Sequence, residues 1–244
     1  MAARDERSGA DQAPAAYLDL RGERTPVPPA GTLTVGREGD VTVDDPYLHR
    51  RFLELSHDAG LLWLANVGSA TTATVSDADG LAQSWLAPGD RLPVVFERTV
   101  VWFTAGPTTY ELGIVQPDAP FVTTARPVPG EGRAVLGRVT FTPEQRLLLL
   151  ALAEDVLRGG HRGAGDIPDS AAAAARLGWT RTKLNRKLDN VCARLAGLGV
   201  RGLAADGDRA ASARRARLVE YALAARLVTV ADLPDLDAVD AEHR

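Results

Sequence analysis

The sequence predicts two domains of different class, an all-β domain followed by an all-α domain. Short segments in which apolar and polar residues alternate fill residues 17–115, and turns rich in glycine and proline separate them. After residue 138 the apolar spacing changes to that of helices, and the charge balance changes with it. These observations favour a β-sandwich joined to a helical bundle.

The composition is that of an ordinary globular protein. The chain has 244 residues, of which 45% are hydrophobic and 25% are charged, which is enough for two domains with cores. Residues 1–16 lack the apolar stretch of a signal peptide and are expected to form a disordered tail. The longest strongly apolar run, residues 147–153, is far shorter than the roughly 20 residues that span a bilayer, so no membrane partner is expected. The single Cys192 cannot form an internal disulfide, which agrees with a cytoplasmic location.

Charge is unevenly distributed along the chain. Residues 138–226 hold 16 Lys and Arg against 9 Asp and Glu, whereas the rest of the chain holds 12 against 23. The two parts therefore differ in sign, at +7 and −11. Such asymmetry is typical of an acidic module joined to one that meets a polyanion, although a charged surface is more often merely solvated.

The strands of the first domain are expected within residues 17–115. In chain order they are the segments YLDLR, TLTVG, VTV, RFLELS, LLWLANV, ATVSD, SWLA, TVVWFTA and YELGIV. Residues 116–138 are rich in proline and glycine and have no helical period, so we expect a linker that holds at most a short strand.

The helical domain is expected over residues 139–230. Its first helix begins at a capping box, in which Thr142 is the cap, Pro143 occupies the first helical position and Gln145 reaches back. It should end at Gly159, before a mobile loop at residues 161–168.

Three further helices are expected. A short one ends at Gly178, and the next begins at Thr180 and turns its apolar face, Leu184, Leu188, Val191 and Leu195, inward. The last is a helix of about a dozen residues within the segment RRARLVEYALAARLV, and the acidic end at 231–244 is expected to be loose.

Two helices joined by a glycine turn, the second basic on its outer face, are what a helix-turn-helix requires. The segments FTPEQRLLLLALAEDVL, AAAAARLGWTRTKLNRKLDNVCARL, LGV and RLVEYALAARLV resemble the four helices of the LuxR-type tetrahelical DNA-binding domain, which is similar to sigma-factor region four. The resemblance covers residues 140–228 and implies a tetrahelical bundle that binds duplex DNA. Because such a motif usually pairs across two half-sites, a homodimer is favoured.

The resemblance also implies which side chains meet DNA. Arginine can bind guanine and asparagine can bind adenine through two hydrogen bonds, whereas a lysine ammonium pairs with phosphate as a point charge. The residues implied to face bases are Thr180, Arg181, Thr182, Asn185 and Arg186, and those nearer phosphates are Lys183, Lys187 and Arg194.

The first domain carries a second resemblance. VGREGDVTVDDPYLHRRFLEL, LWLANVGSATTATVSD and VVWFTAGPTTYEL resemble the forkhead-associated (FHA) domain, an eleven-stranded β-sandwich that binds phosphothreonine peptides through loops at one end. The resemblance covers about residues 17–114. It implies a protein partner, and a site at Arg37, His49, Arg50, Ser69 and Thr71.

The sequence departs from the FHA pattern at functional positions. His49 replaces the phosphate-binding serine, Phe52 replaces the structural histidine, and Thr71-Thr72 replaces the Asn-Gly pair. One hypothesis is that Arg37, His49 and Arg50 still make a cationic pocket for a phosphorylated threonine. The other is a protein-interaction module without phosphate dependence, in which Arg37 pairs with a carboxylate such as Asp44 or Asp45.

No enzyme, metal site or cofactor is expected. The four histidines lack metal-ligand spacing, and no nucleophile and base occur in a catalytic arrangement. The favoured function is a bacterial transcription regulator that binds DNA through its helical domain and a protein through its sandwich. The alternative is an adaptor that binds no DNA, in a kinase-linked or secretion-associated assembly. The two differ in whether the basic helix meets nucleic acid or protein.

Overall fold

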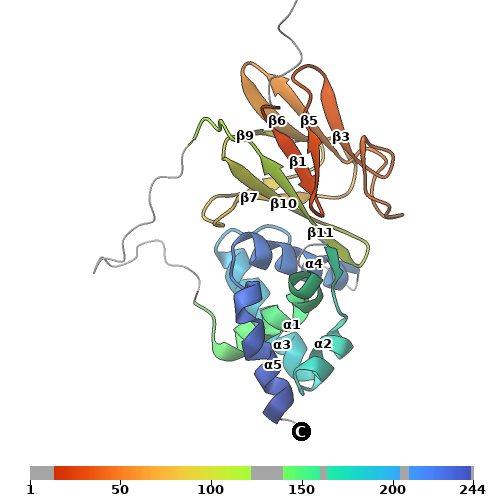
Figure 1. Cartoon of the computed structure of the whole chain (residues 1–244). Coiled ribbons are helices and arrows are strands. Elements are labelled where there is room, and N and C mark those ends of the chain that lie inside the picture. The colour runs from red at the N-terminus through yellow and green to blue at the C-terminus, as the bar shows by residue number, and fades with distance from the viewer. Residues whose placement is uncertain (1–13, 122–139, 160–163, 204–208, 243–244) are drawn as a thin grey trace, which may run out of the picture.

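The computed structural model describes residues 14–121, 140–159, 164–203 and 209–242. Strands come first along the chain and helices follow, as the sequence predicts. Figure 1 shows the strands as a sandwich at the top and the helices as a second body beneath it.

The described residues before 122 form a two-sheet sandwich of eleven strands. In chain order these are β1 (Tyr17–Leu20), β2 (Glu23–Pro26), β3 (Thr32–Gly36), β4 (Val41–Thr42), β5 (Leu53–Asp58), β6 (Leu61–Asn66), β7 (Ala73–Asp77), β8 (Gln83–Leu86), β9 (Arg91–Val94), β10 (Arg98–Ala105) and β11 (Thr108–Val115).

The strands divide into two sheets. The first sheet has the order β2-β1-β11-β10-β7-β8, and the second has the order β4-β3-β5-β6-β9. Neighbouring strands are antiparallel, except that β3 and β4 run parallel. The expected β-sandwich is therefore present.

Alternating apolar side chains from the two sheets fill the sandwich core. In β6, for example, Leu62 and Leu64 are buried while their neighbours are partly exposed, as the period of two requires. Phe52, which precedes β5, packs against Phe103 of β10 with 4.9 Å between ring centroids. Ala16 is also fully buried, so the expected tail does not extend to this residue; residues 1–13 lie outside the described part.

The helical half contains α1 (Pro143–Gly159), α2 (Ser170–Arg176), α3 (Arg181–Gly197), α4 (Arg209–Ala224) and α5 (Leu233–Glu242), with a short turn η2 (Val230–Asp232) before α5. Among the described residues, no helix has the length and apolar character needed to cross a membrane.

The first and third helices begin where the local signals predict, whereas α4 begins at Arg209, five residues before the expected segment, and has 16 residues rather than about a dozen. The capping box of α1 is present, because the Thr142 amide donates to Gln145 Oε1 at 3.0 Å and the Gln145 amide donates to Thr142 Oγ1 at 3.3 Å. Thr180 caps α3 by accepting a bond from the Lys183 amide at 3.2 Å. Both starts are confirmed.

Two segments differ from the expectation. The segment expected to be a mobile loop at 161–168 contains β12 (Ala164–Asp166), which pairs with β11 and so adds to the first sheet; residues 160–163 lie outside the described part. The expected loose end at 231–244 contains α5, whose Leu233 and Leu236 are buried in the helical core. The helical half thus has five helices among its described residues, rather than the four of the expected bundle.

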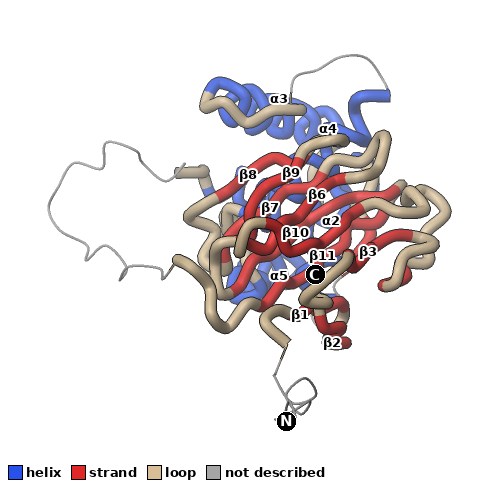
Figure 2. The backbone as a smooth tube through the Cα atoms, turned by 90° about the horizontal axis from the view of Figure 1, so that it is seen from above, coloured by secondary structure: helices blue, strands red, loops and turns tan. Residues whose placement is uncertain are grey.

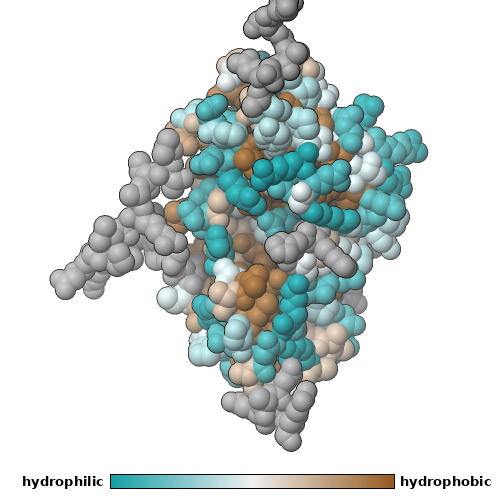
Figure 3. Space-filling model, viewed as in Figure 1, coloured by the Kyte–Doolittle hydropathy of each residue, from teal (hydrophilic) through white to brown (hydrophobic). Residues whose placement is uncertain are grey.

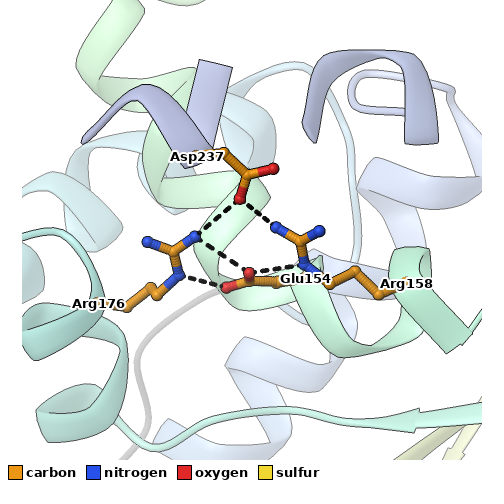
Figure 4. Close-up of polar contacts among 4 residues, drawn as sticks. All are labelled: Glu154, Arg158, Arg176 and Asp237. Carbon is orange, nitrogen blue, oxygen red and sulfur yellow. Dashed lines mark hydrogen bonds and ion pairs between the residues drawn. The ribbon is translucent and has the colours of Figure 1, made fainter. Parts of the chain in front are cut away.

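An ionic network attaches α5 to α1 and α2. Glu154 of α1 accepts bonds from Arg158 at 2.8 Å and from Arg176 of α2 at 2.7 Å. Asp237 of α5 pairs with the same two arginines (Figure 4). Two carboxylates and two guanidinium groups alternate, and this network accompanies the apolar packing of Leu233 and Leu236 of α5 against the bundle.

The two halves share a packed boundary. Val100 and Trp102, on the outer face of β10, belong to the apolar core of the helical half. α4 lies against β10 and β7, and at its end Arg226 donates to the Ala78 carbonyl at 2.7 Å. Seen from above in Figure 2, α3 lies outside the outline of the strands. The linker expected at 116–138 is described only as far as Phe121, which bridges to Phe96.

Candidate functional site

Three connecting segments meet at one end of the sandwich. They are the turn 37–40 between β3 and β4, the loop 43–52 before β5, and the loop 67–72 after β6. The Arg37 amide donates to the His49 carbonyl at 3.1 Å, and the Glu38 amide donates to the Arg50 carbonyl at 2.8 Å. The backbone thus places Arg37 beside His49 and Arg50, as the sequence predicts.

Gly36 allows this close approach. A Cβ atom at Gly36 would lie 2.4 Å from the Arg50 carbonyl oxygen and 2.8 Å from that of His49. Since real Cβ contacts are essentially never this short, a side chain here would separate the two segments. The glycine before Arg37 is therefore a structural requirement of the site.

The Arg37 side chain is half-buried, and within the described residues it has no ion pair. Asp45, one of the carboxylates expected as its partner, instead accepts a bond from the Tyr110 hydroxyl at 2.6 Å and from the Tyr47 amide at 2.8 Å. Asp44 is exposed and makes no ion pair with Arg37. The hypothesis of an Arg37–carboxylate pair is therefore wrong for this structure.

Two further cationic groups lie beside Arg37. Arg50 is exposed and pairs with the exposed Glu38 at 3.3 Å, a pair of the kind that contributes little. His49 Nδ1 lies 2.6 Å from the Arg51 carbonyl oxygen, which requires the proton on Nδ1. Nε2 of the exposed ring is then left to accept a bond when neutral or to donate one when protonated.

Asn66, which the sequence analysis did not select, holds the third loop. Its buried side-chain amide donates to the carbonyl oxygens of Thr71 at 2.9 Å and Leu86 at 3.1 Å, and its Oδ1 accepts from the Gly68 amide at 3.0 Å. The signal that could have identified it is an asparagine that ends an apolar alternation just before a glycine.

The loop that Asn66 holds lies close to His49. A Cβ at Gly68 would lie 3.7 Å from His49 Cβ. Ser69, in the same loop, is exposed, whereas Thr71 is half-buried and contributes its carbonyl to the Asn66 bond. The structure therefore brings the loops of all five predicted residues to one end of the sandwich.

The turn that presents Arg37 is rigid. Thr34 donates to Asp40 Oδ2 from its amide at 2.8 Å and from its hydroxyl at 2.7 Å. These bonds, the side-chain one foremost, hold the pKa of Asp40 below its usual value. The turn is thus closed by the side chains at its two ends, and this limits the positions open to Arg37.

The second candidate surface is the outer face of α3. Arg181, Thr182 and Arg186 are exposed, and Asn185 is half-buried. The four-residue connection from α2 contains Gly178 at φ +62°, as a tight turn between two helices requires. The side chains expected to face bases are therefore accessible, apart from the Thr180 hydroxyl, which caps the helix.

The cations expected near phosphates have partners within the protein. Lys183 pairs with Glu144 of α1 at 2.8 Å, and Lys187 pairs with the same carboxylate. Hydrogen bonds from these two lysines lower the pKa of Glu144 to about 2. Arg194 donates to the Thr140 carbonyl at 2.7 Å. Their role toward a phosphate stays a prediction, but these three side chains already hold the start of α1.

A cavity of about 550 Å³ lies between the two halves. Its apolar wall includes Trp102, Leu157, Leu223 and Val228, and Glu111 lines its polar side. Figure 3 shows an apolar area on the face where the sandwich meets the helices. Burial raises the pKa of Glu111. The walls of this cavity come from both halves, so the cavity exists only when the sandwich and the helices are packed together.

Among the described residues, no group of three or more His, Cys, Asp and Glu side chains is placed to hold a metal ion. Cys192 is buried in the helical core, where burial raises the pKa of its thiol to about 11. This cysteine is therefore a packing residue rather than a reactive one.

The chain is similar to solved FHA domains. The FHA-1 domain of Mycobacterium tuberculosis Rv1747 is 17% identical, with a TM-score of 0.32, over 42% of this chain and 95% of that domain. The FHA domain of MEK1, solved with a phosphothreonine peptide of HOP1, is 14% identical, with a TM-score of 0.34, over 43% and 100%. The FHA domain of FhaA, solved with the intracellular domain of Rv3910, is 20% identical, with a TM-score of 0.31, over 41% and 98%.

No protein-family model and no curated protein matches this chain.

Proposed function

We propose that this protein is a non-enzymatic interaction protein whose sandwich binds a phosphorylated segment of a partner protein. The ligand would meet the end of the sandwich that carries Arg37, His49, Arg50 and Ser69. A phosphothreonine has close to two negative charges and three acceptor oxygens. Guanidinium, imidazole and hydroxyl donors on neighbouring loops match that chemistry.

The observation that carries this proposal is that Arg37 is partly buried and has no carboxylate partner among the described residues. The other sandwich arginines that have no ion pair within the described part of the chain are exposed: Arg21, Arg51 and Arg98. A partly buried charge without a partner loses hydration without compensation. An anionic ligand would supply that compensation.

Exposed apolar side chains beside the loops support a peptide rather than a free anion. Tyr47 is 68% exposed and Val67 is 41% exposed, and both lie in the segments that meet at this end. A peptide could bury them on either side of its phosphate.

The proposal is tested with a degenerate peptide library that contains one fixed phosphothreonine, and with the same library unphosphorylated. The full chain should bind only the phosphorylated library. Arg37→Gln should weaken binding by at least about tenfold, because the charge-assisted bonds to phosphate are lost.

A control is Arg98→Gln, because Arg98 is exposed at the start of β10, whereas Tyr47 of the site packs on Gly106 just after the other end of this strand. This change removes the same charge and should leave binding intact. Equal binding of both libraries, or full affinity in Arg37→Gln, would contradict the proposal.

A second candidate function is the binding of duplex DNA by α3. The observation in its favour is that Arg181, Thr182 and Arg186 project from an exposed helix face with no ion pair among the described residues. This supports the transcription-regulator hypothesis, and the adaptor that binds no DNA is its alternative.

Fluorescence anisotropy of the full chain with a selected pool of duplexes separates the two. A regulator should bind selectively, with an affinity that falls steeply with salt, and Arg186→Ala should relax the base preference. Binding that is weak and unselective at low salt would favour the adaptor.

A further inference from the structure

Three arginines gather on the helical half: Arg181, which belongs to the predicted DNA-binding set, and Arg214 and Arg215, which neither predicted site includes. Arg181 begins α3, and Arg214 and Arg215 lie on α4. Burial is the largest cause of the lowered pKa of Arg215; the charge of Asp169 raises this pKa, and the charges of Arg214 and Arg181 lower it. The three guanidinium groups therefore lie close enough to repel one another.

Two carboxylates, Asp169 and Asp189, offset that repulsion in part, and against three arginines they leave an excess of one positive charge. The Asp169 side chain caps α2, where it accepts hydrogen bonds from the Ala171 and Ala172 amides at 2.8 Å each. Asp189 of α3 pairs with Arg214 at 2.6 Å. Arg181 and Arg215 make no ion pair within the described residues.

Hydrogen-bond donors in the cluster also lack acceptors. The Nε atoms of Arg214 and Arg215 are both buried and have no hydrogen-bond partner among the described residues. Within the described part of the chain, the Arg215 side chain makes one hydrogen bond, a long one of 3.4 Å to the Ser170 hydroxyl. Buried donors without acceptors are uncommon in folded proteins and call for an explanation.

We propose that Arg181, Arg214 and Arg215, with the Ser170 hydroxyl beside them, form a binding site for a phosphate group. A phosphate oxyanion would accept bonds from the guanidinium groups and offset their repulsion. The phosphate could belong to a nucleic-acid backbone or to a small phosphate ion.

In its nucleic-acid form, this site rests on the second candidate function and deepens it. The cluster borders the start of α3 on the α4 side, whereas Lys183 and Lys187 turn toward Glu144 of α1. When α3 binds DNA, contacts to the phosphate backbone of the DNA would then come from the arginines of α4 rather than from Lys183 and Lys187.

The experiment compares the full chain with Arg215→Gln, Arg181→Gln and the control Arg201→Gln. Arg181 is exposed, so its variant should fold even if the half-buried Arg215 contributes to packing. Arg201 is exposed, follows α3 and makes no side-chain ion pair among the described residues. All three variants lose one charge.

Two probes are used, a mixed-sequence DNA duplex over a salt series and sodium phosphate against sodium chloride at equal ionic strength. The duplex is followed by anisotropy and phosphate by the rise in melting temperature. If the site holds a backbone phosphate, Arg215→Gln and Arg181→Gln should each weaken duplex binding about tenfold and lower the salt slope by about one. The control should change neither.

The outcomes separate this site from the function it deepens. Loss of phosphate stabilisation in the two cluster variants, with no effect on the duplex, would make a small phosphate the ligand. If both probes are unchanged in the cluster variants, the site is overturned. If duplex binding then still depends on Arg186, DNA binding stands without this site.

Discussion

Arg217 of α4 lies over the indole ring of Trp85 in β8, with its guanidinium carbon 3.8 Å from the ring centroid. The same guanidinium donates to the Thr74 hydroxyl, and its Nε donates to the Arg201 carbonyl at 3.1 Å. It also lies 3.5 Å from Glu220. A buried ion pair and a cation–π contact thus join the helices to the first sheet.

Removal of one charge from this pair should be costly. Arg217→Met leaves Glu220, 5% exposed, without its cation and should lower the free energy of unfolding by about 3–5 kcal/mol. The double variant Arg217→Met, Glu220→Leu should recover most of that loss, because two apolar residues can replace a buried pair. Urea denaturation measures both, and a loss below about 1 kcal/mol in the single variant would contradict the expectation.

Glu220 should also make stability depend on pH. Burial raises its pKa to about 7, although hydrogen bonds from Thr104 and Thr74 and the charge of Arg217 act in the opposite direction. Because the folded-state pKa lies above the unfolded one, this carboxyl contributes stability below about pH 4.5, and the contribution is lost as the pH rises to about 7.

Glu220→Gln should therefore flatten the stability profile between these pH values, by on the order of 1–3 kcal/mol. The comparison is made as wild type minus variant across pH 4.5–7.5, so that other carboxylates cancel. Parallel profiles would show that Glu220 does not titrate in this range.

Gly36→Ala should disrupt the phosphopeptide site through the backbone. The added Cβ would meet the Arg50 carbonyl at 2.4 Å, and we expect a loss of about 1–3 kcal/mol of stability, as for overpacking elsewhere. Peptide binding should fall with it. Gly197→Ala is the control, because a Cβ there meets nothing within 4 Å. Equal melting temperatures for the two variants would exclude this cause.

Gly165→Ala should detach β12. The Cβ would lie 2.3 Å from the Val156 amide nitrogen on α1, a backbone atom that cannot move aside without shifting the helix. The Ile167 amide, which donates to the Pro107 carbonyl at 3.0 Å, should then exchange its hydrogen faster. Unchanged protection of this amide would mean that α1 and β12 can separate without loss of pairing.

The attachment of α5 should depend on its apolar contacts more than on its charges. Leu236 is fully buried, so Leu236→Ala should cost about 2–5 kcal/mol. Asp237 is half-exposed in the network with Arg158 and Arg176, so Asp237→Asn should cost less than about 1 kcal/mol. Thermal unfolding compares the two, and the reverse order would show that the network dominates.

Features that depend on neighbouring residues could be predicted from the sequence. The helix starts at Thr142 and Thr180 need only residues within one turn, and alternation along each strand is local as well. The Gly36-Arg37 and His49-Arg50 segments could be selected as candidate site residues because each matches part of the FHA sequence pattern. The contact between them arises only in the fold.

Features that depend on distant partners could not be predicted. β12 has three residues and exists because β11 and α1 enclose it. The acidic end folds because Leu233 and Leu236 pack into the helical core, while Arg158 and Arg176 offset the charge of Asp237. Lys187 pairs with Glu144, and Arg215 comes within electrostatic range of Arg181, only after the helices have packed. The residue spacing within one helix does not predict which residues of another helix it will contact.

The position of β12 has a consequence for the covalent chain. Three residues that follow α1 complete the edge of a sheet built from residues before 122, and Val100 and Trp102 of that sheet are buried among the helices. A protease site introduced between Phe121 and Thr140 should therefore yield two fragments that migrate together on gel filtration. Either fragment expressed alone would expose an unpaired strand edge or a bare apolar face, so the two halves form one unit of folding.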